Sequence, residues 1–286
     1  MRLVDSPSLA AQTRVAEMAK KDPLVAVRLL KLVNSAYYGF ASEVRDIDRA
    51  VRLLGPPSSV AGIVLGMSMV QMQATMEGPA GPLYTRLIRH SLATAYLAQW
   101  LETELEVEGG KRGAFSIGLL HDFGKIAFVF SYPEDAKKLY DSPEPRSDEQ
   151  WSAAERELFG CSHQAAGHRL AEGLDLPPEV VGHLSGQTAS SVSDIVIASE
   201  AAARAFGFSF NEPIDWESAR SLEVWDRLVA AFPHRAGERD ELLGNVLNRR
   251  SVVERNVFQL LRRKTDRLPV PIERNPAPRS GSRPAA

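Results

Sequence analysis

Apolar residues recur every three or four positions along almost the whole chain, and this helical spacing restricts the possible folds more than any other feature. The pattern is clearest in residues 83–105 and 190–207. No stretch alternates apolar and polar residues in the way that a half-buried β-strand does. With 286 residues, 44% of them apolar, the chain is long enough to bury a large core. The sequence therefore predicts an all-α protein, folded as a multi-helix bundle.

Interruptions of this pattern divide the chain into parts. Asp22-Pro23 and Asp46 are favourable helix starts, because an Asp side chain accepts a hydrogen bond from a free backbone N–H. Residues 78–82 hold two glycines and two prolines, so we expect a subdomain boundary there, and polar residues 141–150 predict an exposed loop. The expected parts are an N-terminal helical subdomain (1–77), a helical core (83–207), C-terminal helices (208–264, with helices over 216–232 and 238–264) and a disordered tail (265–286).

The composition narrows the possible functions. The formal charge is −2 at pH 7, so no overall basic field favours nucleic acid as a partner. Residues 1–7 lack a signal peptide's apolar core, and no run approaches about 20 apolar residues, so we expect no membrane span. Cys161 is the only cysteine, which excludes an intramolecular disulfide and fits a reducing compartment. These features predict a cytoplasmic protein.

The segment Gly118–Lys125 (GLLHDFGK) carries the strongest chemical signal. An apolar helical run ends there in adjacent His121 and Asp122, and near a helix end both side chains can turn toward one ion. An imidazole nitrogen and a carboxylate oxygen suit Zn, Mn, Fe or Ni, and Lys125 could offer a positive charge to an anionic substrate. An isolated pair of this kind is more often a buried histidine that hydrogen-bonds to its neighbour.

Further histidines lie on apolar faces or at helix ends. His90 falls on the apolar stripe of residues 83–105, and His163 begins a predicted helix, whereas His168 faces elsewhere and is expected at the surface. Several such groups are costly to bury without hydrogen-bond partners or a metal, and a metal would activate water for attack on a phosphoester. If the side chains converge, His90, His121, Asp122 and Glu200 hold one ion, and His163 and His183 lie beside a second.

Two sets of motifs in this chain occur together in one known family. The first set is N-terminal, and the second surrounds the His-Asp pair. The motifs are DPLVAVRLLKLVNS (22–35), IDRAV (47–51), LLG (53–55), His90-Ser91, GLLHDFGK (118–125), and the segments 157–163 and 176–183.

With these motifs, residues 8–207 resemble the HDOD domains, a signalling branch of the HD superfamily of helical metal-dependent phosphohydrolases. The resemblance implies an HD-like bundle with an N-terminal helical subdomain. HD phosphohydrolases use a His, a His-Asp pair and a distal Asp, and two-metal cyclic-di-GMP phosphodiesterases add further histidines. The resemblance thus implies metal-ligand roles for His90, His121, Asp122, His163, His183 and Glu200, with Lys125 catalytic only in an active enzyme.

The sequence departs from the HD pattern at two positions. Leu184 stands where a second of two adjacent histidines is usual, and Ser199-Glu200 stands where Ala-Asp is usual. The longer glutamate arm displaces the carboxylate by about one methylene group, and catalytic geometry tolerates little displacement. The departures favour signalling over catalysis.

Two functions are compatible with these features. The favoured one is a non-catalytic HDOD regulatory output module that binds an unidentified signalling protein or a nucleotide-like ligand. The alternative is a metal-dependent phosphohydrolase or cyclic-dinucleotide phosphodiesterase that uses Fe, Mn, Zn, Ni or Mg. Full metal occupancy favours the enzyme, and an empty or half-filled site favours the module. Because Asp22-Pro23 lies closer to Met1 than is usual in such domains, we also expect a short helix upstream of Met1 in the natural protein.

Overall fold

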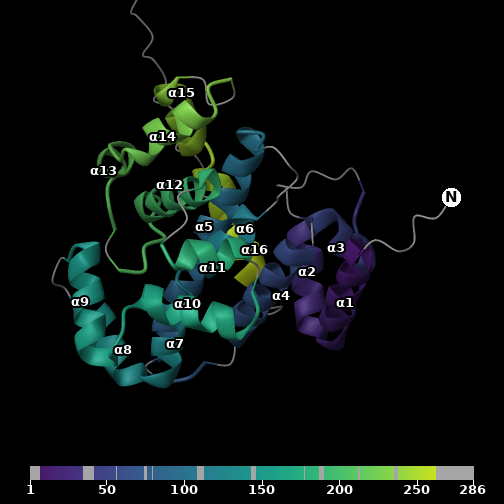
Figure 1. Ribbon diagram of the computed structural model, residues 1–286, viewed down its shortest axis with the longest axis horizontal. Helices are drawn as coiled ribbons and strands as arrows, with labels where there is room; N and C mark the ends of the chain where they lie inside the picture. The colour runs from purple at the N-terminus through teal and green to yellow at the C-terminus, as the bar shows by residue number, and fades with distance from the viewer. Residues whose placement is uncertain are drawn as a thin grey trace, which may run out of the picture.

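The computed structural model consists of α-helices and their connections, within the residues that it describes (Figure 1). These residues are 7–34, 42–55, 57–73, 76–78, 80–107, 113–142, 146–176, 178–186, 190–211, 213–234 and 238–261. The predicted all-α class is confirmed, and the predicted tail at 265–286 lies outside the described residues. In chain order the helices are α1 (Pro7–Lys21), α2 (Pro23–Val33), α3 (Ile47–Leu54), α4 (Pro57–Met72), α5 (Ala80–Glu104), α6 (Ala114–Leu120), α7 (Phe123–Ser131), α8 (Pro133–Tyr140), α9 (Asp148–Phe159), α10 (His163–Gly173), α11 (Pro178–Leu184), α12 (Ser191–Ala205), α13 (Trp216–Arg220), α14 (Val224–Ala231), α15 (Arg239–Leu247) and α16 (Arg250–Leu261).

The first four helices pack against one another at one side of the molecule (Figure 1). Asp22 Oδ1 accepts a hydrogen bond from the Val25 N–H at 3.3 Å, and Asp46 Oδ1 accepts one from the Arg49 N–H at 2.8 Å. Both predicted helix starts are confirmed. Gly55 follows α3 with a φ of 123°, a conformation that glycine adopts without steric strain.

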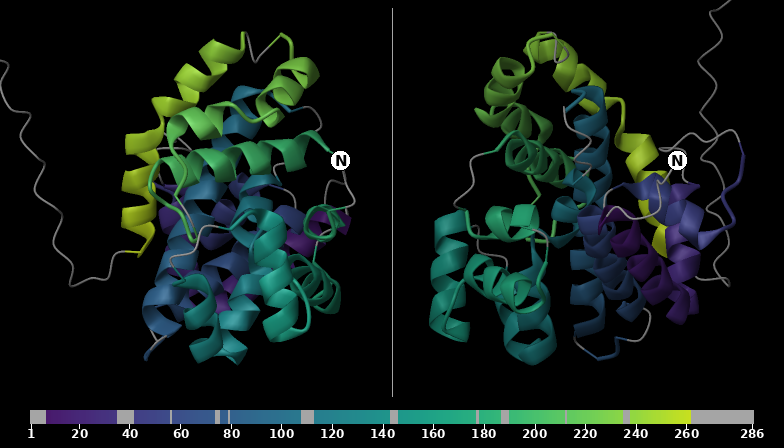
Figure 2. Two further views of the ribbon diagram at one scale, coloured as in Figure 1. Left: turned by 90° about the vertical axis from the view of Figure 1, so that its left-hand side faces the viewer. Right: turned by 45° about the vertical axis from the view of Figure 1, so that its right-hand side comes forward.

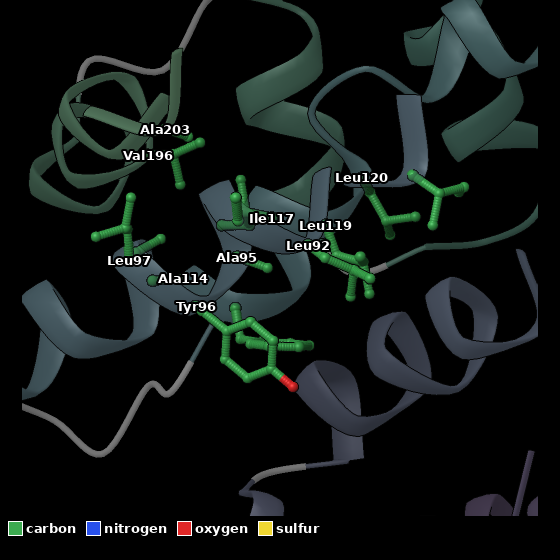
Figure 3. Close-up of a cluster of buried hydrophobic side chains, with 14 of the residues drawn as sticks. Leu92, Ala95, Tyr96, Leu97, Ala114, Ile117, Leu119, Leu120, Val196 and Ala203 are labelled. Carbon is green, nitrogen blue, oxygen red and sulfur yellow. The ribbon is translucent and has the colours of Figure 1, made fainter. Parts of the chain in front are cut away.

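The long helix α5 forms the centre of the fold. It packs against α6 and α12, and side chains of the three helices gather in one apolar cluster (Figure 3). Leu92 and Leu97 of α5, Ile117 and Leu120 of α6, and Val196 of α12 belong to it, each at most 2% exposed. Burial of a side chain of this size contributes about 1.5–3 kcal/mol. Helix α6, which leads into the His-Asp pair, is therefore fixed by apolar packing.

Helix α4 joins the N-terminal helices to this centre through a close crossing with α6. A Cβ added at Gly66 would overlap the Leu119 side chain, and one added at Gly62 would lie 2.8 Å from Ser116 Cβ. These glycines allow the two helices to approach more closely than larger residues would. Helix α4, which precedes residues 78–82, packs directly on α6, which follows them. The subdomain boundary at these residues stays a prediction.

The N-terminus of α6 is capped from another helix. Its N-cap residue Gly113 has no side chain, and the carboxylate of Glu102 on α5 accepts the N–H groups of Gly113 and Ala114 at 3.0 and 3.2 Å. Glu102 is only 7% exposed. A negative charge at this helix end is also favoured by the helix dipole. Glu102 thereby orients the helix that ends at His121.

The C-terminal region contains four described helices where the sequence predicted two. Residues 216–232 form α13 and α14, because the Trp225 indole N–H donates to the Ala219 carbonyl at 2.8 Å and turns the chain between them. The helix predicted over 238–264 likewise divides into α15 and α16 within its described residues, 238–261. At that point Arg249 donates its N–H to a carbonyl three residues back instead of four.

The last described helix, α16, returns along the molecule to the N-terminal helices (Figure 2). It contacts both α5 and α2. Arg28 Nη1 on α2 donates to the Leu260 carbonyl at 2.6 Å, and the Arg249 guanidinium lies 4.8 Å from the Trp100 ring centre on α5. Helix α16 consequently connects the two ends of the described chain through the core helix.

Two other expectations are refined by the structure. The loop predicted at 141–150 ends earlier, because Ser147 and Gln150 form a reciprocal capping box that starts α9 at Asp148. Residues 114–131 form an 18-residue stretch of mean hydropathy 1.3, apolar enough by composition to cross a membrane. However, 78% of this stretch is buried inside the structure, and it is divided between α6 and α7. Its apolar side chains thus belong to the core, and a cytoplasmic location stays a prediction.

We expect Glu102→Ala to lower the free energy of unfolding by about 1–3 kcal/mol, because two N–H groups lose their acceptor. Urea unfolding followed by circular dichroism measures this change. The control is Glu104→Ala on the same helix, whose side chain is exposed, and which should change stability by less than about 0.5 kcal/mol. Equal effects of the two substitutions would contradict the capping role.

Candidate metal centre

The seven residues singled out in the sequence line one cavity of about 380 Å³. The seven residues come from six helices or their ends, because His121 ends α6, Asp122 precedes α7, and the others lie within α5, α7, α10, α11 and α12. In chain order the seven residues are His90, His121, Asp122, Lys125, His163, His183 and Glu200.

His90 and His121 face each other through their Nε2 atoms, which are 3.1 Å apart. Their Nδ1 atoms point outward, each to a backbone carbonyl. His90 Nδ1 lies 2.7 Å from the Phe208 oxygen, and His121 Nδ1 lies 2.7 Å from the Gly118 oxygen. A carbonyl only accepts hydrogen bonds, so each Nδ1 must carry the hydrogen and donate it. In two neutral rings, both Nε2 atoms therefore present lone pairs to each other.

A cation between the two rings would satisfy both lone pairs, either as a proton on one Nε2 atom or as a metal ion bound to both. Burial is the main cause that lowers the pKa of His90 to about 4, so His90 is neutral near pH 7. Two imidazole nitrogens bound to one ion at about 2.1 Å lie about 3.0–3.4 Å apart. The observed separation fits that range. Hydrogen bonds from Nδ1 to carbonyls are also typical of metal-binding histidines, since they fix the ring and its tautomer.

Two carboxylates complete the donor set. Asp122 lies 3.6 Å from His90 Nε2 and 3.5 Å from His121 Nε2. The carboxylate of Glu200 and the two imidazoles offer ligand atoms that all lie within 4.8 Å of one another. Two nitrogen and two carboxylate donors suit Mn, Fe, Zn or Ni better than Mg, which prefers oxygen ligands.

The charges of this group do not balance. Burial raises the pKa of Asp122, but Lys125 and the neighbouring histidines lower it by more than burial raises it. Asp122 therefore stays ionised. The pKa of Glu200 is also lowered, because His121 and His90 outweigh the effect of burial. Burial lowers the pKa of Lys125, whereas Asp122, 2.9 Å from Nζ, raises it above its usual value. When both imidazoles are neutral, two carboxylates and one ammonium leave one negative charge, which a divalent cation would compensate.

His163, the first residue of α10, approaches the same group with a buried carboxylate behind it. Glu155 is completely buried and accepts hydrogen bonds from His163 Nδ1 at 2.7 Å, from the His163 backbone N–H at 2.8 Å and from the Tyr140 hydroxyl at 2.8 Å. His163 Nε2 lies 3.8 Å from Asp122. The sequence analysis missed Glu155 and Tyr140. The sequence holds one signal for Glu155. It follows Trp151 by four positions, so the two residues share one face of α9.

The position of His163 depends on a close crossing of α7 and α10. A Cβ added at Gly124 would overlap the His163 carbonyl and lie 2.8 Å from the backbone nitrogen of Gly167. Gly124 thus permits a close approach of the two helix backbones. Without it, α10 and His163 would have to move away from Asp122.

The remaining histidines differ in their surroundings. His183 Nδ1 lies 3.3 Å from Ser193 Oγ, and burial lowers the pKa of His183 to about 4. Leu184 is buried and lies 3.4 Å from a Cβ built at Gly167, so it fills space between helices. His168 is 31% exposed and lies outside the cavity. A second ion at His163 and His183 stays a prediction, since among the described residues neither belongs to a compact group of three ligand atoms.

We expect the metal-free protein to lose stability as the pH falls from 6 to 4.5. His90 has a pKa of about 4 when folded and about 6.5 when unfolded, so in this window the unfolded chain binds one more proton. The unfolding free energy should fall by about 1.4 kcal/mol per pH unit more in the wild type than in His90→Gln. Urea unfolding in the presence of a chelator measures both slopes. Identical slopes would show that His90 is not held in its neutral form.

Comparison with known proteins places this site in a family. The family model of the HDOD domain matches residues 1–189. A curated protein of Treponema pallidum (strain Nichols), called "Uncharacterized protein", is 24% identical over 180 residues, which are 63% of this chain and 34% of that protein. The chain therefore spans about a third of the length of this relative. Glu200 and Phe208 lie beyond the part that the family model matches.

Solved structures show the same fold. An HDOD domain protein with unknown function from Geobacter sulfurreducens has a TM-score of 0.59 and 18% identity, covering 91% of this chain and 94% of that one. A protein from Shewanella amazonensis SB2B called "Putative phosphohydrolase" has a TM-score of 0.58 and 20% identity, covering 88% and 92%. The family model covers well over half of the residues, and the fold agrees with a solved HDOD structure. The chain belongs to the HDOD domain family.

Proposed function

We propose that this chain is a regulatory HDOD output module whose core holds one divalent metal ion and binds a phosphate-bearing ligand beside it. The facing Nε2 atoms of His90 and His121, 3.1 Å apart and each fixed by an Nδ1–carbonyl bond, carry the proposal for the metal. Asp122 and Glu200 supply two carboxylates, and the single charge of Lys125 does not neutralise both. When bound, the ion supplies Lewis-acid stabilisation to charge on a phosphoryl oxygen.

Lys125 supports the proposal for an anionic ligand. Its ammonium has three N–H donors, and Nζ lies 2.9 Å from each carboxylate oxygen of Asp122, which leaves at least one donor for a phosphate oxygen. The Phe210 ring centre lies 5.5 Å from Nζ and helps to hold the ammonium at the cavity wall.

The cavity favours a ligand of mononucleotide size. Its volume of about 380 Å³ is at the small end of the range of about 300–1,000 Å³ found for ligand pockets. Trp151 and Phe210 offer apolar surface there, and Asn211 Oδ1 is buried without a hydrogen-bond partner. An aromatic wall and a free amide oxygen suit a nucleobase, so a nucleotide fits better than the larger cyclic dinucleotide.

Glu200 favours binding without turnover. Its side chain is one methylene longer than the Asp usual in HD phosphohydrolases, and reacting groups must be placed within a fraction of an ångström. In this proposal, ligand or metal occupancy changes how the module engages a separate signalling protein. The resemblance of the motifs to a signalling branch of the superfamily supports that role.

Phosphoester hydrolysis is the second candidate, and the Glu155–His163 pair favours it. Glu155 accepts the Nδ1 hydrogen of His163 at 2.7 Å, which leaves Nε2 able to move a proton at the cavity. A histidine backed by a buried carboxylate is a usual general acid or base. The Shewanella amazonensis structure, similar in fold, carries the word phosphohydrolase in its name.

We expect protein purified without chelator to contain about one equivalent of a divalent transition metal, measured by elemental mass spectrometry. Asp122→Ala and His121→Ala should lose it, because each removes a donor from the group. The control His168→Ala, outside the cavity, should retain it. A wild-type protein that stays metal-free and gains no thermal stability from added Mn²⁺ or Zn²⁺ would contradict the metal centre.

We expect metal-loaded wild type to bind a nucleoside monophosphate without hydrolysing it, and Lys125→Met to bind it at least tenfold more weakly in calorimetry. Glu200→Asp, which shortens the arm by one methylene, should raise hydrolysis measured by phosphate release. Hydrolysis by the wild type that is lost in His163→Gln would instead support the second candidate.

A further inference from the structure

A second cavity, of about 490 Å³, lies beside the first turns of α5. It shares no lining residue with the cavity at the metal centre. The residues around it come from α5 and from the segment that follows α12. They are Pro82, Thr85, Arg86, Arg89, Gly207, Phe208 and Ser209.

Two arginines dominate this second cavity. Arg86 and Arg89 are three residues apart on one helix, so their side chains are neighbours. Within the described part of the chain, Arg89 has no hydrogen-bond or ion-pair partner, and its guanidinium lies 5.8 Å from the Phe208 ring centre. Arg86 donates through Nη2 to Asp141 at 2.8 Å, but its Nε–H is buried without a partner. Both arginines therefore retain unused donors.

The surroundings leave an excess of positive charge. Asp141 is the carboxylate bonded to Arg86, and it is shared with Lys137 at 2.6 Å. Asp141 thus pairs with two cations, Arg86 and Lys137, and Arg89 has no carboxylate partner among the described residues. Two adjacent arginines repel each other, and a bound dianion would remove that repulsion. The forked guanidinium group matches phosphate oxygens better than any other side chain does.

We infer that Arg86, Arg89 and the segment Gly207–Ser209 form a second ligand site, for a small organic phosphate. The volume equals that of about sixteen waters at about 30 Å³ each, which is more than an inorganic phosphate ion needs. Pro82 and the Phe208 ring give the organic part apolar surface, and the Ser209 hydroxyl can donate to the phosphate.

The second site is connected to the metal centre through one residue. The Phe208 ring lies under Arg89, and the Phe208 carbonyl accepts the Nδ1 hydrogen of His90 at 2.7 Å. A ligand held against Phe208 therefore contacts the residue that fixes the orientation of His90. This connection rests on the proposed metal centre, whereas the phosphate site itself does not. It makes the second site a regulatory one.

Calorimetry on the full, metal-free chain tests the site, with glycerol 2-phosphate and inorganic phosphate as probes at constant ionic strength. The wild type should bind glycerol 2-phosphate more tightly than inorganic phosphate. Arg89→Gln should weaken binding at least tenfold. Arg89→Lys should have an affinity between those of the wild type and Arg89→Gln, because lysine keeps the charge but lacks the forked guanidinium group. The control Arg169→Gln, an exposed arginine on α10, should bind as the wild type does. Loss of binding in Arg89→Gln together with its retention in Arg169→Gln assigns the ligand to the second cavity.

Equal binding by wild type and Arg89→Gln, or no saturable binding by the wild type, would overturn the site. The connection is tested separately by Mn²⁺ titration followed by electron paramagnetic resonance. Glycerol 2-phosphate should change the Mn²⁺ dissociation constant of the wild type and leave that of Arg89→Gln unchanged. An unchanged constant in the wild type would overturn the connection. Failure of the chain to bind Mn²⁺ would count against the metal centre alone, because the first experiment contains no metal.

Discussion

Close approach of helix backbones at Gly118 and Gly124 is the constraint on which the site depends. A Cβ at Gly118 would lie 2.9 Å from the Cα atom of Ala95 on α5, and a Cβ at Gly124 would overlap the His163 carbonyl on α10. These two crossings bring α5 and α10 against the junction that carries His121 and Asp122. The donor atoms are thus placed by packed helices, which hold a site more precisely than loops do. The apolar cluster between α5, α6 and α12 stabilises the same arrangement (Figure 3).

The ion pair between Asp122 and Lys125 offers a different explanation of a buried His-Asp pair, in which the lysine replaces a metal. It accounts for the charge of Asp122. It does not account for the charge of Glu200, nor for two Nε2 lone pairs that face each other at 3.1 Å. A cation between the rings explains all three observations. Lys125 is then free to act on a ligand through its remaining donors.

The helices that the sequence predicted well are those with their own start signals and strong periodicity, such as α2, α3, α5 and α12. The missed breaks at Trp225 and Arg249 arise from a tertiary hydrogen bond and a local three-residue turn, which leave no periodic signal. Within the site, the candidate metal ligands carry recognisable side chains, so the sequence could nominate them. Phe208 acts through a backbone carbonyl, which any residue has, and only the fold reveals it. Glu155 is distinguished from a surface glutamate only by its burial.

The central claim is that His90 and His121 share one metal ion. The most direct measurement is anomalous diffraction at the metal absorption edge, from crystals of protein loaded with Mn²⁺ or Zn²⁺. The account predicts one strong peak about 2.0–2.3 Å from the Nε2 atoms of both His90 and His121, with Asp122 and Glu200 turned toward it. Both Nδ1 hydrogen bonds to carbonyls should persist. Loaded crystals without a peak between these rings, or with the rings turned so that either Nε2 atom points away, would contradict the account.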